Sequence, residues 1–276
     1  MQNLTYHWID DGHDHSLELV HVPGTAGDPY LFGGDPYGWG PAPERIPIEV
    51  CDFYIGSTAV TQALWLHVMG ENPAKRPEID CPVENVSWRH VTEPDGFLYR
   101  LNAGDIHHQL AEQAGCDLKF RLPSETEWEY AARGGLRWRD EFTFSGSNNI
   151  REVAWSGPIW RGGDWYAVNR WRKLMIRLFG SLYEKPVHTR PVGTKAPNQV
   201  GIYDMSGNIW EWCQDVCTDD LDLIPRDGSA YEGQGADRRL RGGCFNNWDI
   251  HCTVFKRYGI ESGAHDGCLG LRLAAS

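Results

Sequence analysis

The stretch that decides the fold lies at the C-terminal end and begins Arg241-Gly-Gly-Cys-Phe-Asn-Asn-Trp-Asp-Ile-His-Cys252. It ends Gly270-Leu-Arg-Leu-Ala-Ala-Ser276. A second stretch, Gly201-Ile-Tyr-Asp-Met-Ser-Gly-Asn-Ile-Trp-Glu-Trp-Cys213, precedes it by one acidic loop. The residues between the two ends of the first stretch follow neither a helical nor a strand period. We therefore expect irregular backbone that is held in place at fixed residues.

Three earlier segments extend this pattern toward the N-terminus: Phe53-Tyr-Ile-Gly with Val60-Thr-Gln, Pro82-Val-Glu-Asn-Val-Ser-Trp88, and Arg121-Leu-Pro-Ser-Glu-Thr-Glu-Trp-Glu-Tyr-Ala-Ala-Arg133. In the last of these, Ser124 and Glu127 have the spacing of a capping box, which starts a helix. Trp128 then shares one helical face with two alanines, and Gly134-Gly135 ends the helix.

Other elements are predicted from local pattern. Strands are expected at 17–22, from alternation, and at 46–55. Thr61 can cap a helix from Gln62 through Val68, and a second helical region is expected at roughly 95–115. The sequence shows no internal repeat and no low-complexity tract.

These five segments, in this order, resemble the formylglycine-generating-enzyme family, also called the sulfatase-modifying factors, which has a C-type-lectin-like fold. The resemblance implies an α+β domain with irregular loops, small antiparallel sheets and two main helices. It covers the main domain, residues 46–276, whose C-terminal segment 241–276 is the expected ligand-binding part. Residues 1–45 are expected to form an N-terminal extension packed on this domain.

Composition limits the classes of partner. The formal net charge of -12 argues against binding to nucleic-acid phosphates as the main activity. The Arg- and Trp-rich stretch 160–177 is a local exception and is interpreted as an irregular insertion. The N-terminus does not have the pattern of a signal peptide, and no apolar run reaches the length of a membrane span. A cytoplasmic protein is expected, with export of a trimmed form as the alternative.

The resemblance also implies a cation site. In relatives, a structural calcium ion is held by the loop that matches Asp204-Met-Ser-Gly-Asn-Ile-Trp-Glu211. Carried over to this chain, Asp204 and Glu211 would supply carboxylates, and Gly207 and Ile209 would supply backbone carbonyls. Such hard oxygen ligands suit Ca²⁺. The alternative is that both carboxylates accept hydrogen bonds from backbone amides while the neighbouring tryptophans fill the core.

The namesake reaction of the family is the copper-dependent oxidation of a substrate cysteine. It relies on two cysteines five residues apart, which hold Cu(I) through sulfur. Here Cys244 and Cys252 are eight apart, and if Cys252 matches one member of the family's pair, the other position is Asn247. We therefore expect neither copper nor this activity, and Cys244 and Cys252 are interpreted as small buried residues.

One branch of the family consists of the variable proteins of diversity-generating retroelements. In that branch, fixed residues of the C-terminal segment alternate with diversified ones. Here the fixed places are occupied by Arg241-Gly-Gly243, Asn246-Asn247, Cys252, Arg257 and Gly270-Leu-Arg-Leu273. An irregular mixture of aromatic, aliphatic and acidic residues lies between them, as is typical of a recognition surface. The candidate ligand-binding residues are Phe245, Trp248, Asp249, Ile250, His251, Thr253, Phe255, Tyr258, Ile260, Glu261, His265 and Asp266.

The favoured interpretation is a non-catalytic protein that binds a protein or another macromolecular ligand through this C-terminal face. One alternative is a metal-dependent oxidative enzyme of the same family, for which Cys252, His251, His265 and Cys268 are the nearest candidates. A second alternative is a non-catalytic partner module of a larger complex. The core positions among the aromatic candidates cannot be separated from the surface positions by sequence pattern.

Overall fold

The computed structural model describes residues 2–10, 12–34, 44–157 and 188–276. The predicted Arg- and Trp-rich insertion at 160–177 lies outside these residues. The helices are α1 (Gln62–Met69), α2 (Trp88–Thr92), α3 (Phe97–Ala103), α4 (Asp105–Ala114), α5 (Glu125–Ala132) and α6 (Ile150–Val153). The strands are β1 (Leu4–Asp10), β2 (His13–Val22), β3 (Tyr30–Gly33), β4 (Arg45–Ile48), β5 (Phe53–Gly56), β6 (Phe120–Arg121), β7 (Trp210–Val216), β8 (Asp237–Arg241), β9 (Tyr258–Glu261), β10 (Leu269–Leu271) and β11 (Ala274–Ala275).

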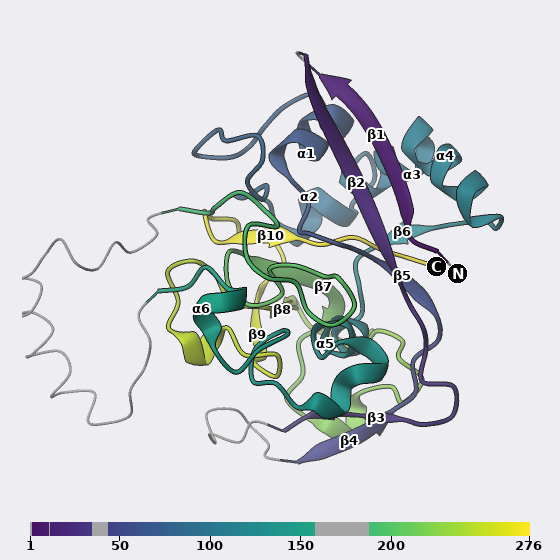
Figure 1. Ribbon diagram of the computed structural model, residues 1–276, viewed down its shortest axis with the longest axis vertical. Coiled ribbons are helices and arrows are strands. Elements are labelled where there is room, and N and C mark those ends of the chain that lie inside the picture. The colour runs from purple at the N-terminus through teal and green to yellow at the C-terminus, as the bar shows by residue number, and fades with distance from the viewer. Residues whose placement is uncertain (1, 11, 35–43, 158–187) are drawn as a thin grey trace, which may run out of the picture.

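The N-terminal residues enter the central sheet. Strands β1 and β2 form a long antiparallel hairpin that pairs Leu4 with Leu19. Strand β2 then pairs with β5, so the five-stranded sheet has the order β1-β2-β5-β11-β6 (Figure 1). Alternate hairpin residues, including Leu4, Tyr6 and Leu17, are buried beneath α1 and α4. The segment 1–45 therefore supplies strands to the domain rather than an added layer outside it.

The C-terminal residues are built into two sheets. Strand β10 runs parallel to β7 in a four-stranded sheet with the order β10-β7-β8-β9, in which the other pairs are antiparallel. Strand β11 lies between β5 and β6 in the five-stranded sheet. Strands β3 and β4 form a separate two-stranded sheet. The expected α+β architecture with small sheets is confirmed, and the expected antiparallel pairing holds in these sheets except between β10 and β7, which are parallel.

One predicted strand is divided in two. The run 46–55 forms β4, which pairs with β3, and β5, which pairs with β2 in the five-stranded sheet. Between them the chain turns at Val50, whose backbone carbonyl accepts a hydrogen bond from the amide of Thr25 at 2.9 Å. The carboxylate of Asp52 accepts another from the amide of Gly24 at 2.8 Å. These contacts are distant in sequence, which is why local alternation did not reveal the break.

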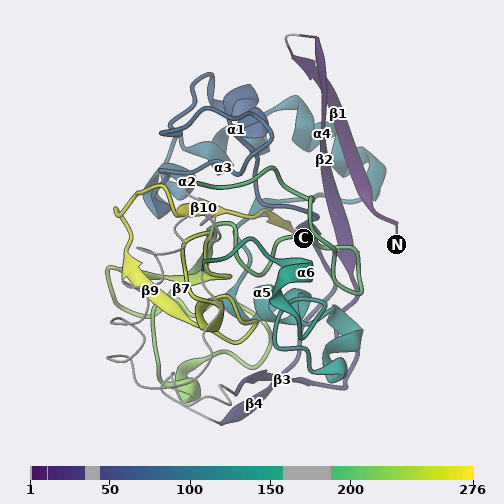
Figure 2. The ribbon, with the colours of Figure 1, turned by 60° about the vertical axis from the view of Figure 1, so that its left-hand side comes forward.

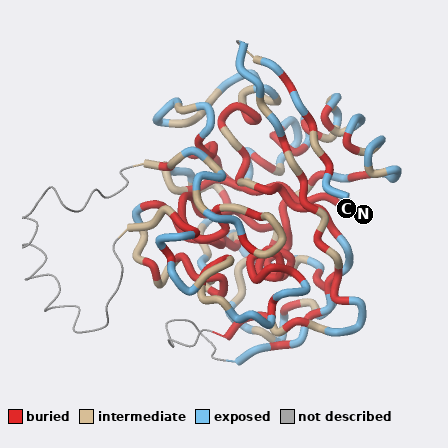
Figure 3. The backbone as a smooth tube through the Cα atoms, in the orientation of Figure 1, coloured by how far each residue is buried: buried red, intermediate tan, exposed pale blue. Residues whose placement is uncertain are grey.

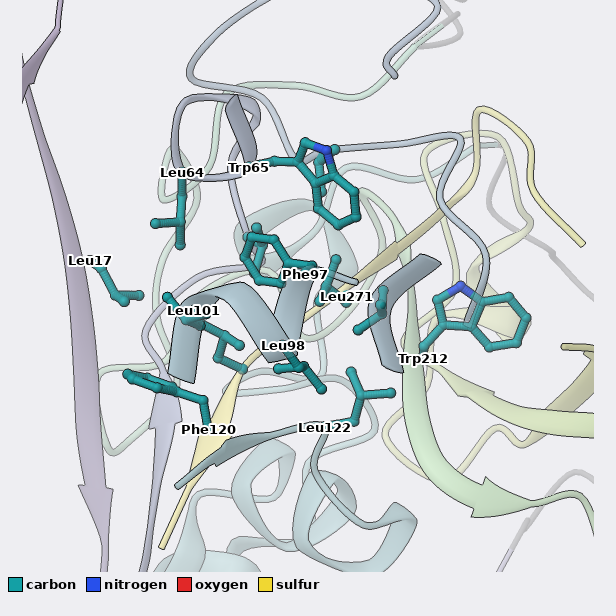
Figure 4. Close-up of a cluster of buried hydrophobic side chains, with 14 of the residues drawn as sticks. Leu17, Leu64, Trp65, Phe97, Leu98, Leu101, Phe120, Leu122, Trp212 and Leu271 are labelled. Atoms are coloured by element: carbon teal, nitrogen blue, oxygen red, sulfur yellow. The ribbon is translucent and has the colours of Figure 1, made fainter. Parts of the chain in front are cut away.

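The predicted helix starts are confirmed. Thr61 caps α1 by accepting a hydrogen bond from the amide of Leu64, and Ser124 and Glu127 form the capping box of α5. The region 95–115 contains two helices, because the chain is extended at Gly104. Helices α1 and α3 pack together through Trp65 and Phe97, whose ring centroids are 4.7 Å apart within the apolar cluster of Figure 4.

Helix α5 lies at the centre of the molecule. All eight of its residues are buried, including Glu125, Glu127 and Glu129, and Figure 3 shows this helix enclosed by the rest of the chain. Buried carboxylates are costly unless they are paired with positive charge or hydrogen-bond donors. Neighbours along the chain supply part of this pairing: Arg121 pairs with Glu127 at 2.6 Å and Arg133 with Glu129 at 2.9 Å, whereas Glu125 is paired with more distant residues.

Among the described residues, no helix is long and apolar enough to cross a lipid bilayer.

Candidate functional site

The C-terminal segment is fastened to α5 by Arg241 at its first end. The Arg241 side chain is fully buried, and its Nη2 donates a short hydrogen bond to a carboxylate oxygen of Glu129. The same guanidinium donates to the backbone carbonyls of Val254 at 2.9 Å and Lys256 at 2.7 Å. Arg241 thus joins the helix to backbone that lies more than ten residues further along the segment.

A second attachment lies in the middle of the segment. Arg257 donates two parallel hydrogen bonds to Glu125, with Nε and Nη2 each 2.8 Å from a carboxylate oxygen. Arg239 lies 3.2 Å from the same carboxylate. Burial alone would raise the pKa of Glu125, but the charges of Arg239 and Arg257 outweigh it and hold the pKa at about 2. Glu125 is therefore ionised throughout the neutral range.

Arg272 makes the third attachment, near the C-terminus. Its guanidinium forms a bidentate pair with the buried carboxylate of Glu211, at 2.8 Å from Nη2 and 3.0 Å from Nε. It also donates to the carbonyls of Gly56 and Tyr203, each at 2.7 Å. The three arginines assigned to fixed places by sequence are thus the residues that attach the segment to the interior.

Four candidate ligand-binding residues are buried, and the expected surface exposure is not found for them. Phe245 and Phe255 are each 7% exposed and belong to two different apolar clusters. Thr253 and Asp249 are also buried. These side chains pack under the segment, because an irregular chain lying on the core must turn some residues inward.

The remaining candidates reach the surface to different degrees. Tyr258, Glu261, His265 and Asp266 are exposed, whereas the others are half-buried. Tyr258 is 47% exposed. We call the following set the C-terminal face: Trp248, Ile250, His251, Tyr258, Ile260, Glu261, His265 and Asp266. Figure 2 turns this side forward and shows β9, in yellow, with the neighbouring C-terminal loops.

Residues outside the segment support this face. The ring of Tyr258 packs on Trp210 of β7 with centroids 5.4 Å apart. Arg89 of α2 pairs with Glu261 at 3.2 Å, and the ring of His90 lies 5.8 Å from that of His265. No sequence pattern assigned these neighbours to the site. The helix that carries Arg89 and His90 begins directly after Ser87 and lies before the predicted helical region 95–115, and its position beside β9 depends on contacts distant in sequence.

The candidate catalytic residues do not form one cluster. Cys252 is fully buried, and its thiol lies 3.7 Å from the carbonyl of Trp248. Burial raises the pKa of Cys252 and lowers that of the half-buried His251. Cys268 instead lies beside Cys244, since the side chain of Asn246 contacts both sulfurs. Among the described residues, no group of three or more His, Cys, Asp or Glu side chains is placed to hold a metal ion.

The surroundings of the two carboxylates in the loop 204–211 indicate how well this loop suits a calcium ion. Asp204 is buried, and one of its oxygens accepts a hydrogen bond from the amide of Gly193 at 2.7 Å. Its other oxygen has no hydrogen-bond partner. Burial raises the pKa of Asp204 to about 6, and the nearby charge of Glu211 adds to the shift. A partnerless buried carboxylate oxygen beside a second carboxylate fits a hard cation.

Glu211 fits this role less simply. Its carboxylate already pairs with Arg272 and accepts a hydrogen bond from the indole nitrogen of Trp128 at 2.6 Å. A cation at this loop would share Glu211 with these donors and would take Asp204 as its free carboxylate. Gly207 and Ile209 would supply backbone carbonyls, as expected from the resemblance.

Comparison with known proteins places this architecture in a family. A model of the sulfatase-modifying factor enzyme 1-like domain matches residues 26–276. The formylglycine-generating enzyme of Streptomyces coelicolor is 30% identical over 269 residues, which cover 93% of this chain and 73% of that enzyme. The chaperone protein LppX of Paenibacillus barcinonensis is 34% identical over 195 residues, which cover 60% of this chain and 63% of that protein.

A solved structure shares the whole architecture. Treponema denticola variable protein 1 superposes with a TM-score of 0.68 and 25% sequence identity, covering 98% of both chains. The fold expected from the resemblance, C-type-lectin-like and of the formylglycine-generating-enzyme type, is confirmed. The domain model matches residues 26–276, which include helix α5, the loop 204–211 and the attached C-terminal segment, and the chain therefore belongs to the sulfatase-modifying factor family.

Proposed function

We propose that this protein is a non-catalytic binding protein whose C-terminal face recognises a protein or another macromolecular ligand. The observation that carries the proposal is that the C-terminal segment contains both buried, ion-paired residues and exposed residues. Arg241, Arg257 and Arg272 are buried against carboxylates of the interior, whereas Tyr258, Glu261 and His265 between them point outward. The backbone is held by one set of residues, and the other set can change without loss of the fold.

The similarity to Treponema denticola variable protein 1 supports this reading, because it extends over nearly the whole of both chains. Recognition by such a face depends on a few aromatic anchors surrounded by polar residues. Tyr258 and Trp248 are the aromatic members of the C-terminal face. Glu261, His265 and Asp266 would supply polar contacts around them.

The first test is sequencing of the 3′ end of the gene across a cell population, together with its flanking DNA. Retroelement diversification predicts substitutions concentrated in the codons of the C-terminal face, at adenines of a neighbouring template. The codons of Arg241, Arg257 and Arg272 should stay constant. An invariant segment with no template nearby would contradict diversification and leave a fixed binding surface to be tested by the next experiment.

The second test separates binding from stability. Replacing Trp248 and Tyr258 together by Ala should abolish capture of a partner that the immobilised wild-type chain retains. The unfolding midpoint should change by only a few degrees, because neither side chain is fully buried. The control Tyr99→Ala, which alters a 60% exposed tyrosine outside the face, should keep the partner.

Two substitutions of buried residues show how much stability is lost when a core side chain is removed. Phe245→Ala or Phe255→Ala removes a buried ring and should cost about 3–5 kcal/mol of unfolding free energy. If the Trp248 and Tyr258 substitutions cost as much as these, both would be core residues. If the double variant and Tyr99→Ala capture the partner equally well, the C-terminal face is not the binding surface.

An oxidative enzyme is the second candidate, favoured by the 30% identity to the Streptomyces coelicolor formylglycine-generating enzyme. Stoichiometric copper retained by the reduced protein, and lost on Cys252→Ala, would support it. The binding proposal predicts no retained copper. Asn247 at the position of one family cysteine, together with the full burial of Cys252, favours the binding protein.

A further inference from the structure

Two cysteines lie at the two ends of the C-terminal segment and contact each other. Cys244 follows the Arg241-Gly-Gly turn, and Cys268 immediately precedes β10. The thiol of Cys244 lies 3.3 Å from the side-chain oxygen of Asn246, and the side-chain nitrogen of the same Asn246 lies 3.4 Å from the sulfur of Cys268, so one asparagine side chain contacts both sulfurs. Every residue of the C-terminal face lies in the stretch of chain between these two cysteines.

The backbone holds both cysteines beside the start of β7. The amide of Phe245 donates to the carbonyl of Asn208 at 3.0 Å. The amide of Trp210 donates to the carbonyl of Cys268 at 2.9 Å. Residues 208 and 210 are two positions apart, so the two ends of the segment are fixed next to each other by one short piece of backbone.

The two sulfurs differ in their surroundings. Cys244 is 1% exposed, whereas Cys268 is half-buried and can be approached from solvent. The side-chain amide of Asn246 donates to the sulfur of Cys268 at 3.4 Å. The neighbouring Cys244 thiol, which is the largest influence, and the Asn246 amide lower the pKa of Cys268 despite its partial burial. Cys268 is therefore the better attacking thiolate.

Cys252 does not compete for this pairing. It is fully buried, and its thiol lies near the carbonyls of Trp248, at 3.7 Å, and Cys244, at 4.0 Å. It packs in a small apolar cluster with Phe144 and residues of α6. A reagent in solution reaches Cys268 before it can reach Cys252.

We propose that Cys244 and Cys268 form a disulfide bond that closes residues 245–267 into a covalent loop beneath the C-terminal face. A low-molecular-weight disulfide such as oxidised glutathione is the oxidant. The Cys268 thiolate attacks one sulfur of this reagent, forms a mixed disulfide and releases one thiolate, which takes up a proton. Cys244 then loses its proton to solvent, attacks the Cys268 sulfur and releases the second thiol. One reagent disulfide is reduced to two thiols for each protein disulfide formed.

The bond constrains the unfolded chain more than the folded one, because the two ends already lie together in the fold. It should therefore raise the unfolding midpoint and slow proteolysis within 245–267. Any change in ligand affinity rests on the proposed function, whereas formation of the bond does not. A fixed, undiversified segment would leave the disulfide prediction intact.

The experiment uses the full chain equilibrated in glutathione buffers from fully reduced to fully oxidised, then acid-quenched and alkylated. Cleavage with trypsin and with a protease that cuts before Asp separates Cys244 from Cys252. The expected product links peptide 242–248 to peptide 266–272. Oxidation should raise the wild-type unfolding midpoint by roughly 5–10 °C.

Cys268→Ser, a near-isosteric change, should abolish both the linked peptide and the rise in midpoint. Cys244→Ala should do the same, and Cys116→Ser, at an exposed cysteine elsewhere, should retain both. Three results would overturn the proposal: no 242–248 to 266–272 link in fully oxidised buffer, a link through Cys252 instead, or an undiminished midpoint rise in Cys268→Ser.

Discussion

At the scale of single residues, the most consequential feature is the set of ion pairs inside the molecule. Arg241 and Arg257 share the carboxylates of Glu125 and Glu129, and Arg272 pairs with Glu211. A buried ion pair adds little net stability compared with apolar packing, but removing one partner leaves an uncompensated charge. The pairs therefore define one position for the C-terminal segment and penalise any other.

Glu125→Gln tests this directly. The change leaves Arg239 and Arg257 without their buried counter-charge, so the unfolding free energy should fall by about 3–5 kcal/mol. Denaturant unfolding measures the loss. The matched control is Glu261→Gln, which removes an exposed pair with Arg89 and should cost about 0–1 kcal/mol. Similar losses of unfolding free energy in the two variants would show that the buried ion pairs of Glu125 matter no more for stability than the exposed pair.

The raised pKa of Asp215 should make the stability of the fold depend on pH. Burial raises its pKa to about 7, with a further contribution from the charge of Glu125. The folded state then binds a proton more tightly than the unfolded state between about pH 4 and pH 7. The stability from this group is complete below about pH 4 and is lost as the pH rises through about 7.

The measurement is the unfolding free energy of the wild type and of Asp215→Asn between pH 5 and pH 8. The wild type should lose stability across this range, by an amount on the order of 3 kcal/mol if this group dominates. The variant, which cannot titrate, should show a flatter profile. A parallel profile in both proteins would place the titration on another group.

At the scale of elements, helix α5 shows how tertiary structure overrides pattern. Its sequence predicts one apolar face with Trp128, yet Glu125, on the same side of the helix, and Glu129, on another side, are equally enclosed. The charge of Glu125 is accommodated because strand β8 and the C-terminal segment supply arginines from a distance in sequence, and Glu129 also pairs with the neighbouring Arg133. The helix is therefore the base on which the candidate face is built.

The loop 204–211 carries the calcium prediction. In a calcium complex, the partnerless oxygen of Asp204 would coordinate the ion. Addition of Ca²⁺ should therefore raise the unfolding midpoint, and a chelator should reverse the rise. Asp204→Asn should remove the response. Mg²⁺ at the same concentration is the control ion, since it prefers fewer protein ligands. An unchanged midpoint in saturating Ca²⁺ would count against the site.

At the scale of the whole molecule, the C-terminus is part of the central sheet. Strand β11 lies between β5 and β6, and the carbonyl of Ser276 accepts a hydrogen bond from the amide of Lys119 at 3.1 Å. The same chain end therefore completes the core and carries the candidate face. Under the proposed diversification, substitutions should stop before Arg272, because its guanidinium pairs with the buried Glu211.

Deletion of residues 274–276 should prevent stable folding, because it removes an interior strand and leaves β6 and one edge of β5 unpaired. Far- and near-ultraviolet circular dichroism of the purified chain measures the outcome. Deletion of residues 1–3 is the control of equal length and should be tolerated, since Gln2 and Asn3 are exposed. A cooperative, wild-type-like transition after the C-terminal deletion would refute this role for β11.

Features that depend on neighbours along the chain could be predicted from sequence. The caps at Thr61 and Ser124 were predicted because a side chain there bonds an amide three residues later. The motif order also led to the family and its fold. In the irregular segment, by contrast, the residues that face inward are known only from the folded chain. Phe255 and Tyr258 look alike in sequence, but one packs in the core and the other lies at the surface. Without a helix or strand period, burial depends on contacts far away in the chain.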